Sequence, residues 1–280
     1  MTRELEGRAL AASLRAEAGE RAARARAAGV VPALAIVLAT DDGGARWYSE
    51  SIARAAGNAE IACELITLPA DASEDLVAGT VNRLAEDDAV HGILVQTPLP
   101  AGVDRGRIAA AIPAHKDIDG MNPTSLGRLV AGLDSFAPAT AAAVMELLAH
   151  HEIELEGVEV VIAGRSTVVG KPLAHLCLDQ NATVTICHSR TRDLPAITSR
   201  ADVFIAAVGR AKLFTAEYVR DGAIVIDVGT NETADGSLVG DVDAASVAGK
   251  AGGLSPVPGG VGSVTTAKLL LNVVQAAEAD

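Results

Sequence analysis

The sequence has few aromatic residues, few cysteines and no excess of basic residues. Aromatic side chains make up 2% of its 280 residues, so the core must be built from Ala, Val, Leu and Ile. A net charge of −13 without any basic run argues against nucleic-acid binding, which needs cations to neutralise phosphates. The three cysteines have no CxxC spacing, so neither a disulfide framework nor a metal site is expected. A small molecule is the expected partner.

Long apolar runs are also missing. No apolar stretch reaches about 18 residues without a charge, Gly or Pro, so neither a membrane span nor a membrane partner is expected. The N-terminal segment carries acidic residues and has no apolar central region, which is unlike a signal peptide. With its unpaired cysteines, the chain is predicted to be soluble and cytoplasmic.

What the sequence does contain is a regular alternation of strand-like and helical segments. Apolar runs predict strands at residues 33–39, 65–68, 92–96, 158–164, 182–188, 202–209, 223–229 and 253–257. Amphipathic or alanine-rich segments predict helices at residues 1–28, 43–57, 72–87, 103–112, 168–180, 193–200 and 265–279. This alternation predicts an α/β fold with two domains, each with a mainly parallel sheet flanked by helices.

Residues 117–141 interrupt the alternation with several Gly, Pro and Thr residues, so we expect a passage between domains there. The apolar C-terminal helix is expected to dock on the first domain. The predicted first domain therefore comprises residues 1–137 plus 264–280. The predicted second domain comprises residues 138–263.

The second domain carries a candidate nucleotide site. Residues 160–170 predict a strand, a turn with Gly164, Arg165 and Ser166, and the start of a helix. Such a turn offers free N–H groups and a helix dipole to a pyrophosphate. The segment lacks the GxGxxG pattern, so an ordinary strand-to-helix turn is the alternative interpretation.

The end of the next strand indicates which dinucleotide would bind. A carboxylate commonly stands there to bind the ribose 2′-OH of NAD, whereas this strand is followed by Ser189 and Arg190. Hydroxyl and guanidinium groups would instead bind a 2′-phosphate, which Arg165 can also reach. These features favour NADP and a Rossmann-like domain, the alternative being a solvated basic loop. Small residues at 206–209 and 227–231 give a nicotinamide ring access to the backbone.

Several longer segments resemble one enzyme family. They are VHGILVQTPLP (90–100), KDIDGMNPTSLGRL (116–129), VVIAGRSTVVGKP (160–172), GAIVIDVGTN (222–231) and SPVPGGVGSVTTAKLL (255–270). Together they resemble the bifunctional methylenetetrahydrofolate dehydrogenase/methenyltetrahydrofolate cyclohydrolase family over essentially the whole chain.

The resemblance implies a two-domain enzyme, usually a homodimer, that takes tetrahydrofolate derivatives as substrates and NADP as cofactor. It implies a folate-binding catalytic first domain, completed by the C-terminal helix, with the folate in a cleft between the domains. The residues that match its catalytic and folate-site positions are Tyr48, Gln96, Asp119, Pro258, Gly259 and Gly260. The residues that match its cofactor-site positions are Gly164, Arg165, Ser166, Ser189 and Thr230.

Two of these matches also make chemical sense without the family. The Asp119 carboxylate can bind the guanidine-like edge of a pterin through two hydrogen bonds. Pro258-Gly259-Gly260 leaves no side chain where a flat ring would touch the backbone. The alternatives are a capping aspartate and an ordinary turn.

The sequence departs from the family in the helix that carries Tyr48. The family has a catalytic lysine four residues after this tyrosine, where the present sequence has Ile52. Positions 48 and 52 share one helix face, whereas Arg54 lies about 200° around the helix from Ile52. The chain has no lysine before Lys116, which belongs to a different segment.

Loss of the lysine affects the two family reactions differently. Hydride transfer mainly needs alignment of the reactants, whereas hydrolysis of the methenyl cation needs an acid/base group, typically worth ~10²–10⁴-fold. We therefore predict an NADP-dependent methylenetetrahydrofolate dehydrogenase with weak or absent cyclohydrolase activity. A water held by Gln96 with Ser49 or Glu50 is the alternative source of a base. Alternative functions are hydride transfer on another imine-like substrate and non-catalytic folate binding.

Overall fold

The computed structural model describes residues 2–233 and 235–279, and the chain divides into two compact units. The three-stranded unit comprises Ser13–Ala139 and Thr266–Asp280, and the six-stranded unit comprises Met1–Ala12 and Thr140–Thr265. These boundaries lie two residues beyond the predicted ones. A larger difference is that the N-terminal residues belong to the six-stranded unit, because β1 (Arg3–Glu4) pairs in parallel with β11 (Gly253–Leu254).

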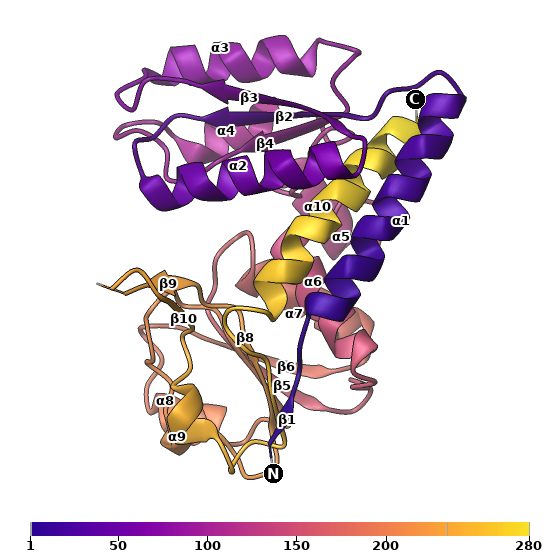
Figure 1. The fold of residues 1–280 in the computed structure, drawn as a ribbon. Helices are drawn as coiled ribbons and strands as arrows, with labels where there is room; N and C mark the ends of the chain where they lie inside the picture. Colours follow the sequence, from indigo (N-terminus) through magenta and orange to yellow (C-terminus); the bar gives the residue numbers. More distant parts are fainter. Residues whose placement is uncertain (1, 234, 280) are drawn as a thin grey trace. The chain divides into compact units, whose positions relative to one another are not determined.

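The three-stranded unit contains a parallel sheet in the order β3-β2-β4. Its strands are β2 (Ala33–Leu38), β3 (Ala62–Thr67) and β4 (Gly92–Val95). Helices α3 (Glu74–Ala85) and α2 (Gly43–Asn58) lie on opposite faces of the sheet (Figure 1). Val37, Val81, Ile93 and Ile108 of β2, α3, β4 and α4 (Arg105–Ala111) meet in one buried cluster. Coverage of both faces explains why β2 is apolar throughout.

Polar residues set where the helices of this unit begin. The side chains of Asp42, Ser73, Asp104 and Asn122 accept backbone N–H groups at the starts of α2, α3, α4 and α5 (Pro123–Val130). The predicted interdomain passage thus contains a helix of its own, because Asn122 caps a segment that starts with proline. Helix α6 (Ala139–His150) was also not predicted.

From Thr266 onward, the C-terminal helix α10 (Val261–Glu278) belongs to the three-stranded unit. Asn272 Nδ2 donates to the carbonyl of Ile118 over 2.8 Å. Glu278 pairs with Arg21 of α1 (Arg8–Ala27), with 2.5 Å between Nη2 and Oε2. These contacts hold the C-terminal helix against the loop before α5 and against α1.

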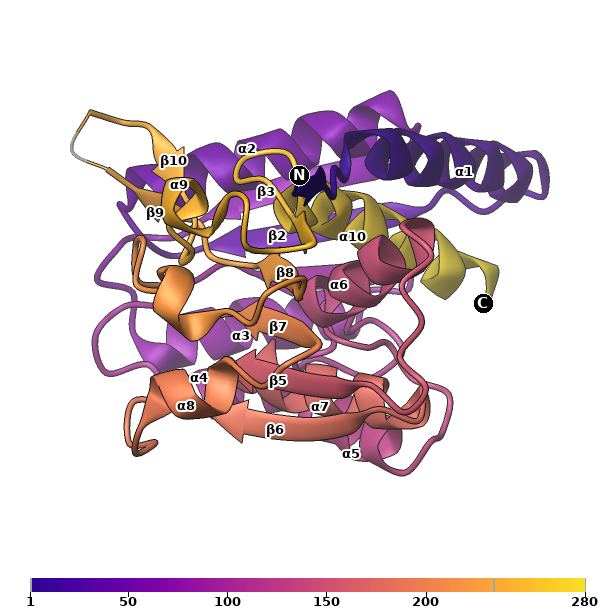
Figure 2. The same cartoon turned by 90° about the horizontal axis from the view of Figure 1, so that it is seen from below.

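The six-stranded unit has an all-parallel sheet in the order β1-β11-β8-β7-β5-β6. Its four longer strands are β5 (Glu159–Ala163), β6 (Thr183–Cys187), β7 (Val203–Ala206) and β8 (Ile224–Asp227), which lie side by side in Figure 2. Counted from β5, the order is that of a doubly wound sheet, whose ligand crevice lies where the winding reverses, between β5 and β7. The predicted two-domain α/β fold with parallel sheets is confirmed.

Helices cover both faces of this sheet. Helix α7 (Gly170–Asp179) lies on one face, and α8 (Leu194–Thr198) and α9 (Ala244–Val247) lie on the other (Figure 1). The η1 turn (Ala216–Tyr218) and an antiparallel ribbon of β9 (Asn231–Glu232) and β10 (Leu238–Val239) complete the unit. Three of the chain's few aromatic rings gather in this core, where Phe214 stacks edge-on against Phe204 and Tyr218 at 5.0 and 5.3 Å. Among the described residues, no helix is long and apolar enough to cross a membrane.

Candidate active site

Helix α2 presents Tyr48 beside its buried face. Asp42 fixes the start of the helix by accepting the N–H of Ala45 over 2.7 Å. The fully or almost fully buried residues of this helix are Ala45, Ser49, Ile52 and Ala56. Tyr48 is half-buried and precedes Ile52 by one turn. The residue at the lysine position therefore belongs to the core, with no exposed surface.

The phenol of Tyr48 lies in a poorly hydrated environment. Burial raises its pKa to about 12, and the nearby negative charge of Asp119 adds to this effect. A hydrogen bond with Thr266 of α10 acts in the opposite direction. Side chains from α2, from the segment after α4 and from α10 therefore meet around Tyr48, which stays protonated at neutral pH.

The loop that carries Asp119 is anchored by Lys116. This lysine is 5% exposed, and its Nζ donates to the carbonyls of Ala85 and Asp87 over 3.1 and 2.7 Å. Because its ammonium is used to hold the loop against the end of α3, it does not replace the lysine missing from α2.

The same loop closes around the carboxylate of Asp117. This side chain has no exposed surface and accepts the N–H groups of Met121 and Asn122 over 2.9 and 2.8 Å. Gly120, the residue after Asp119, has a φ of +59°, and a Cβ there would lie 2.5 Å from the nitrogen of Pro138. Only glycine fits this position, so the backbone beside Asp119 has a single conformation.

Asp119 titrates close to neutral pH. Burial and the charge of Asp117 raise its pKa to about 7, against the opposing effects of the Ala139 N–H and of Arg105. Both its acid and its carboxylate forms are therefore populated near pH 7. The carboxyl group can accept hydrogen bonds from a ligand and can also give up or take up a proton.

Gln96 lies directly after β4, at the carboxyl edge of the three-stranded sheet. It is half-buried, its backbone N–H donates to the carbonyl of Val37 over 2.9 Å, and its Nε2 donates to that of Thr97 over 3.1 Å. The sheet register thus fixes its backbone at the edge where parallel sheets bind ligands.

In the six-stranded unit, Gly164 makes the turn after β5. Its φ is +132°, and a Cβ there would overlap the carbonyl oxygen of Ala207, which follows β7. A Cβ on Gly170 would overlap the carbonyl oxygen of Gly164, so α7 also starts in close contact with the turn. In a dinucleotide-binding turn, one glycine allows the tight turn and another allows the helix to pack closely. Gly164 and Gly170 serve these two roles here, although the segment lacks the GxGxxG spacing. The turn leaves a backbone cradle that suits a pyrophosphate.

The predicted phosphate-binding side chains lie at neighbouring strand ends. Ala163 and Cys187 are paired residues of β5 and β6, so Arg165 and Ser189 follow adjacent strands. Arg165, Ser166 and Ser189 are all exposed.

Thr230, also exposed, follows β8, which is separated from β5 by β7. The structure thus brings the predicted cofactor-site residues to one edge of one sheet.

The Pro258–Gly260 loop belongs to the six-stranded unit, and its glycines have a packing role. Gly259 has a φ of +111°, and its carbonyl accepts the N–H of Gly7 over 2.8 Å. A Cβ on Gly7 would lie 2.5 Å from the carbonyl oxygen of Gly260. The missing side chain of Gly7 therefore lets the N-terminal segment pack against this loop, and a Cβ on Gly260 would meet the carbonyl oxygen of Pro256 within the loop itself.

Sequence reasoning missed several residues around these sites. Thr266, Gly170 and Asp241 were not singled out, and Asp227 was included only as part of a strand end, without a role for its carboxylate. An aspartate at the end of an apolar strand, as in IVID, is a usable signal for Asp227. No local pattern indicates that Thr266 meets Tyr48, because the two are far apart in sequence.

The doubly wound sheet with a glycine turn at its switch point defines a dinucleotide-binding α/β protein. Models of the tetrahydrofolate dehydrogenase/cyclohydrolase catalytic domain and NAD(P)-binding domain match residues 5–119 and 138–280. The chain belongs to the tetrahydrofolate dehydrogenase/cyclohydrolase family.

Similar proteins extend over the whole chain. The bifunctional protein FolD of Nocardia farcinica is 57% identical over 277 residues, which are 99% of this chain and 98% of that protein. The crystal structure of the bifunctional enzyme FolD from Campylobacter jejuni has 39% identity and a TM-score of 0.96, covering 100% and 99% of the two chains. The Trypanosoma brucei enzyme, solved with NADP and an inhibitor, has 33% identity and a TM-score of 0.94, covering 99% and 98%.

The strained position beside Asp119 gives a stability test. Gly120→Ala should lower the free energy of unfolding by more than about 2 kcal/mol, because alanine meets both a positive φ and backbone atoms. Gly127→Ala is the matched control, since nothing lies within 4 Å of a Cβ at that exposed helix position. The control should be neutral or stabilising by up to about 1 kcal/mol. Equal effects in chemical denaturation would show that the loop is not constrained as described.

The raised pKa of Asp119 predicts a pH-dependent contribution to stability. Between its ordinary pKa of 3.8 and its folded value of about 7, the folded state holds a proton that the unfolded state has lost. The stability contributed by this group is therefore full below pH 4 and declines as the pH rises through 7. The thermal unfolding midpoint of the wild type, measured relative to that of Asp119→Asn, should therefore fall between pH 5 and pH 8. A difference that does not change with pH would contradict the assignment.

Proposed function

We propose that this protein catalyses the NADP-dependent oxidation of 5,10-methylenetetrahydrofolate to 5,10-methenyltetrahydrofolate in one-carbon metabolism, with weak or absent cyclohydrolase activity. The observation that carries this proposal is the fully buried Ile52 beside Tyr48, in a chain whose dinucleotide-binding turn is intact. Membership of the family supplies the reaction class. The residues of the two sites decide between its two activities.

Tyr48, Gln96 and Asp119 are the proposed folate-site residues. The carboxylate form of Asp119 matches the paired N–H donors on the edge of a pterin. The hydroxyl of Tyr48, which stays protonated, can donate a hydrogen bond while its ring covers an apolar face of the ligand. We propose that Pro258, Gly259 and Gly260 line the same folate site.

The cradle after β5 fits NADP. Gly164 leaves room for a pyrophosphate at the backbone, while Arg165 and Ser189 follow adjacent strands and supply the charge and hydroxyl suited to a 2′-phosphate. We also assign Ser166 and Thr230 to this site. When bound, the dinucleotide serves as the hydride acceptor. The chain's own contribution is to hold the reactants in line, which does not need an ammonium group at position 52.

Cyclohydrolysis needs a proton removed from water and a proton delivered to a ring nitrogen. An isoleucine side chain performs neither step, and general acid/base catalysis is typically worth ~10²–10⁴-fold. An ammonium group would also repel the methenyl cation, so its absence favours retention of that product. The site is therefore expected to hold the methenyl product rather than hydrolyse it.

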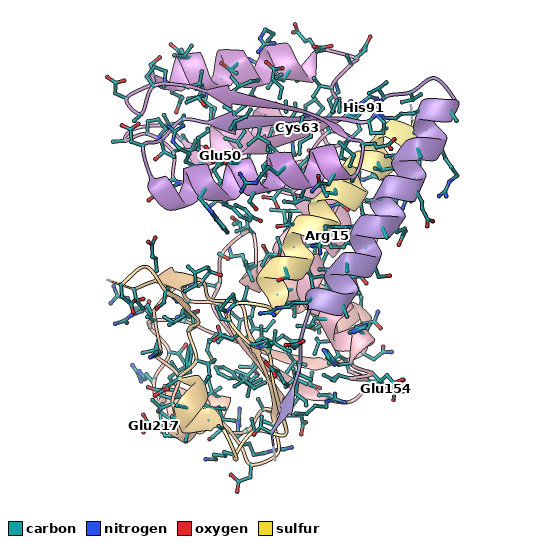
Figure 3. The ribbon with its side chains drawn as sticks, viewed as in Figure 1. Arg15, Glu50, Cys63, His91, Glu154 and Glu217 are labelled. Carbon is teal, nitrogen blue, oxygen red and sulfur yellow. The ribbon has the colours of Figure 1, made fainter. Side chains whose placement is uncertain are left out.

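Glu50 and Ser49, the neighbours of the lysine position on α2, are poor substitutes for the lysine. Glu50 (Figure 3) is exposed on α2 and pairs with Arg54, with 3.9 Å between Oε2 and Nη1. Ser49 has no exposed surface, and its hydroxyl donates to the carbonyl of Ala45 over 2.9 Å. Neither arrangement supports a water-activating role next to Gln96.

We further propose that the protein is a cytoplasmic homodimer. The strand β6 forms one edge of the six-stranded sheet, and Ile186 on it is 39% exposed. An open edge strand presents unpaired backbone groups that can pair with another chain, so a second copy would cover this edge. The free cysteines Cys63, Cys177 and Cys187 suit a reducing compartment.

The NADP preference can be tested with Arg165→Ala. Loss of a charge-assisted contact to phosphate is worth about 1.5–3 kcal/mol, so the KM for NADP should rise about 10- to 100-fold while the KM for NAD changes little. Arg200→Ala is the control, because this exposed arginine pairs with Glu159 at the amino end of the sheet. Equal changes for both dinucleotides, or equal use of NAD by the wild type, would refute the 2′-phosphate assignment.

The cyclohydrolase prediction can be tested with Ile52→Lys. The lysine should raise the rate of methenyl hydrolysis by about 10²-fold, while changing the dehydrogenase rate less. Ile52→Met, which adds length without an amine, should leave hydrolysis at the wild-type level. Because position 52 is fully buried, thermal unfolding of both variants should accompany the assay. Rapid hydrolysis by the wild type, with no gain in the lysine variant, would contradict the proposal.

A further inference from the structure

Two buried aspartates of the six-stranded unit form a chain of hydrogen bonds that ends at the ligand-binding edge of the sheet. Asp227 is the last residue of β8 and is 4% exposed, and Asp241 has no exposed surface. The partners of both carboxylates include several backbone N–H groups. Neither carboxylate was assigned to the binding sites described above.

Asp241 holds the loop that follows β7. Its Oδ2 accepts the N–H groups of Val208 and Gly209 over 2.6 and 3.0 Å, and its Oδ1 accepts that of Arg210 over 2.8 Å. Asn231, after β8, donates its Nδ2 to the same Oδ1 over 3.0 Å. One carboxylate therefore fixes three consecutive amides beside the switch point and links them to the loop after the next strand.

Asp227 in turn holds Asp241. Its carboxylate accepts the N–H groups of Gly229, Asp241 and Val242 over 3.0, 2.9 and 2.9 Å. Gly229 and Gly240 leave no space for a side chain, since a Cβ at either position would overlap the carboxylate of Asp241 or Asp227 respectively. The two carboxylates can therefore occupy these positions only because glycines stand opposite them.

The position of this loop determines what it can influence. The turn at Gly164 packs against the carbonyl of Ala207, so the residues after β7 form the second wall of the crevice at the switch point. The proposed 2′-phosphate ligands follow β5 and β6, on the other side of this crevice. We therefore expect the loops after β7 and β8 to contact the nicotinamide half of the dinucleotide.

We propose that Asp241, held by Asp227, is a positioning residue that fixes the backbone of residues 207–210 for the nicotinamide half of the cofactor. The inference rests on the proposed dinucleotide function and adds the groups that set its geometry. Neither aspartate touches the ligand, because both are buried beneath the loop. A shift of about 1 Å at such a loop can lower a hydride-transfer rate by about 10²-fold.

The test compares Asp241→Asn with Asp243→Asn, a control two residues away that lies outside this set of hydrogen bonds. In the protein without cofactor, amide hydrogen exchange at residues 208–210 should speed up at least tenfold in Asp241→Asn alone. Turnover at saturating NADP should fall at least tenfold, while the dissociation constant of 2′,5′-ADP, which probes the adenosine half, stays within about twofold.

Asp227→Asn gives a second, milder variant and should produce the same pattern to a smaller degree, which keeps the test decisive if Asp241→Asn does not fold. Unchanged turnover, or equal losses of turnover and of 2′,5′-ADP affinity in the folded variants, would overturn the positioning role. Wild-type protein that binds neither NADP nor 2′,5′-ADP would instead overturn the proposed function.

Discussion

Buried carboxylates bonded to backbone amides shape the ligand-binding edges of both sheets. Asp117 closes the loop next to Asp119 in the three-stranded unit, and Asp227 and Asp241 tie together the loops after β7 and β8 in the six-stranded unit. A carboxylate can accept several N–H groups at once, so one side chain fixes a loop that has no regular secondary structure. Burial makes these bonds strong and makes their loss expensive.

The same constraint sets the proton chemistry around Tyr48 and Asp119, the proposed folate site. The negative charge of Asp117, held two residues away, helps to raise the pKa of Asp119 to about 7, and Asp119 in turn helps to raise that of Tyr48. A lysine at position 52 would supply a positive charge to this group, whereas Ile52 leaves it without one from that helix face. A single core substitution is therefore tied to the choice between oxidation and hydrolysis.

Local patterns were sufficient to predict most of the fold. Runs such as ALAIVL and EVVIA are buried on both faces, which is why they could be identified as parallel strands. Helix α6 was missed because its sequence, ATAAAVMELLAH, follows a stretch of turn-forming residues and is nearly uniformly apolar. The assignment of the N-terminal residues depended on a two-residue strand, too short to leave a pattern.

The sequence suggests site residues only where the chemistry lies within one segment, and these stay predictions. Arg165 and Ser189 are recognisable because strand ends in parallel sheets have known roles. The contacts of Tyr48 with Thr266, and of Asp241 with the loop after β7, depend on long-range packing and were not predicted. The interpretation of Gly259 and Gly260 as ring-binding positions did not include the close approach of Gly7 to the carbonyl of Gly260, because sequence does not show which backbone a glycine approaches.

The fate of the methenyl product can be followed in a single experiment, which tests whether the protein oxidises its substrate without hydrolysing the product. The wild-type protein is mixed anaerobically with methylenetetrahydrofolate and NADP, and the absorbances of NADPH and of the methenyl product are followed together. The account predicts that the two species form in equal amounts and that the methenyl product then decays no faster than it does in buffer alone. NADPH formation with only a small, transient methenyl signal would mean that the protein hydrolyses its product without the lysine, and would contradict the account.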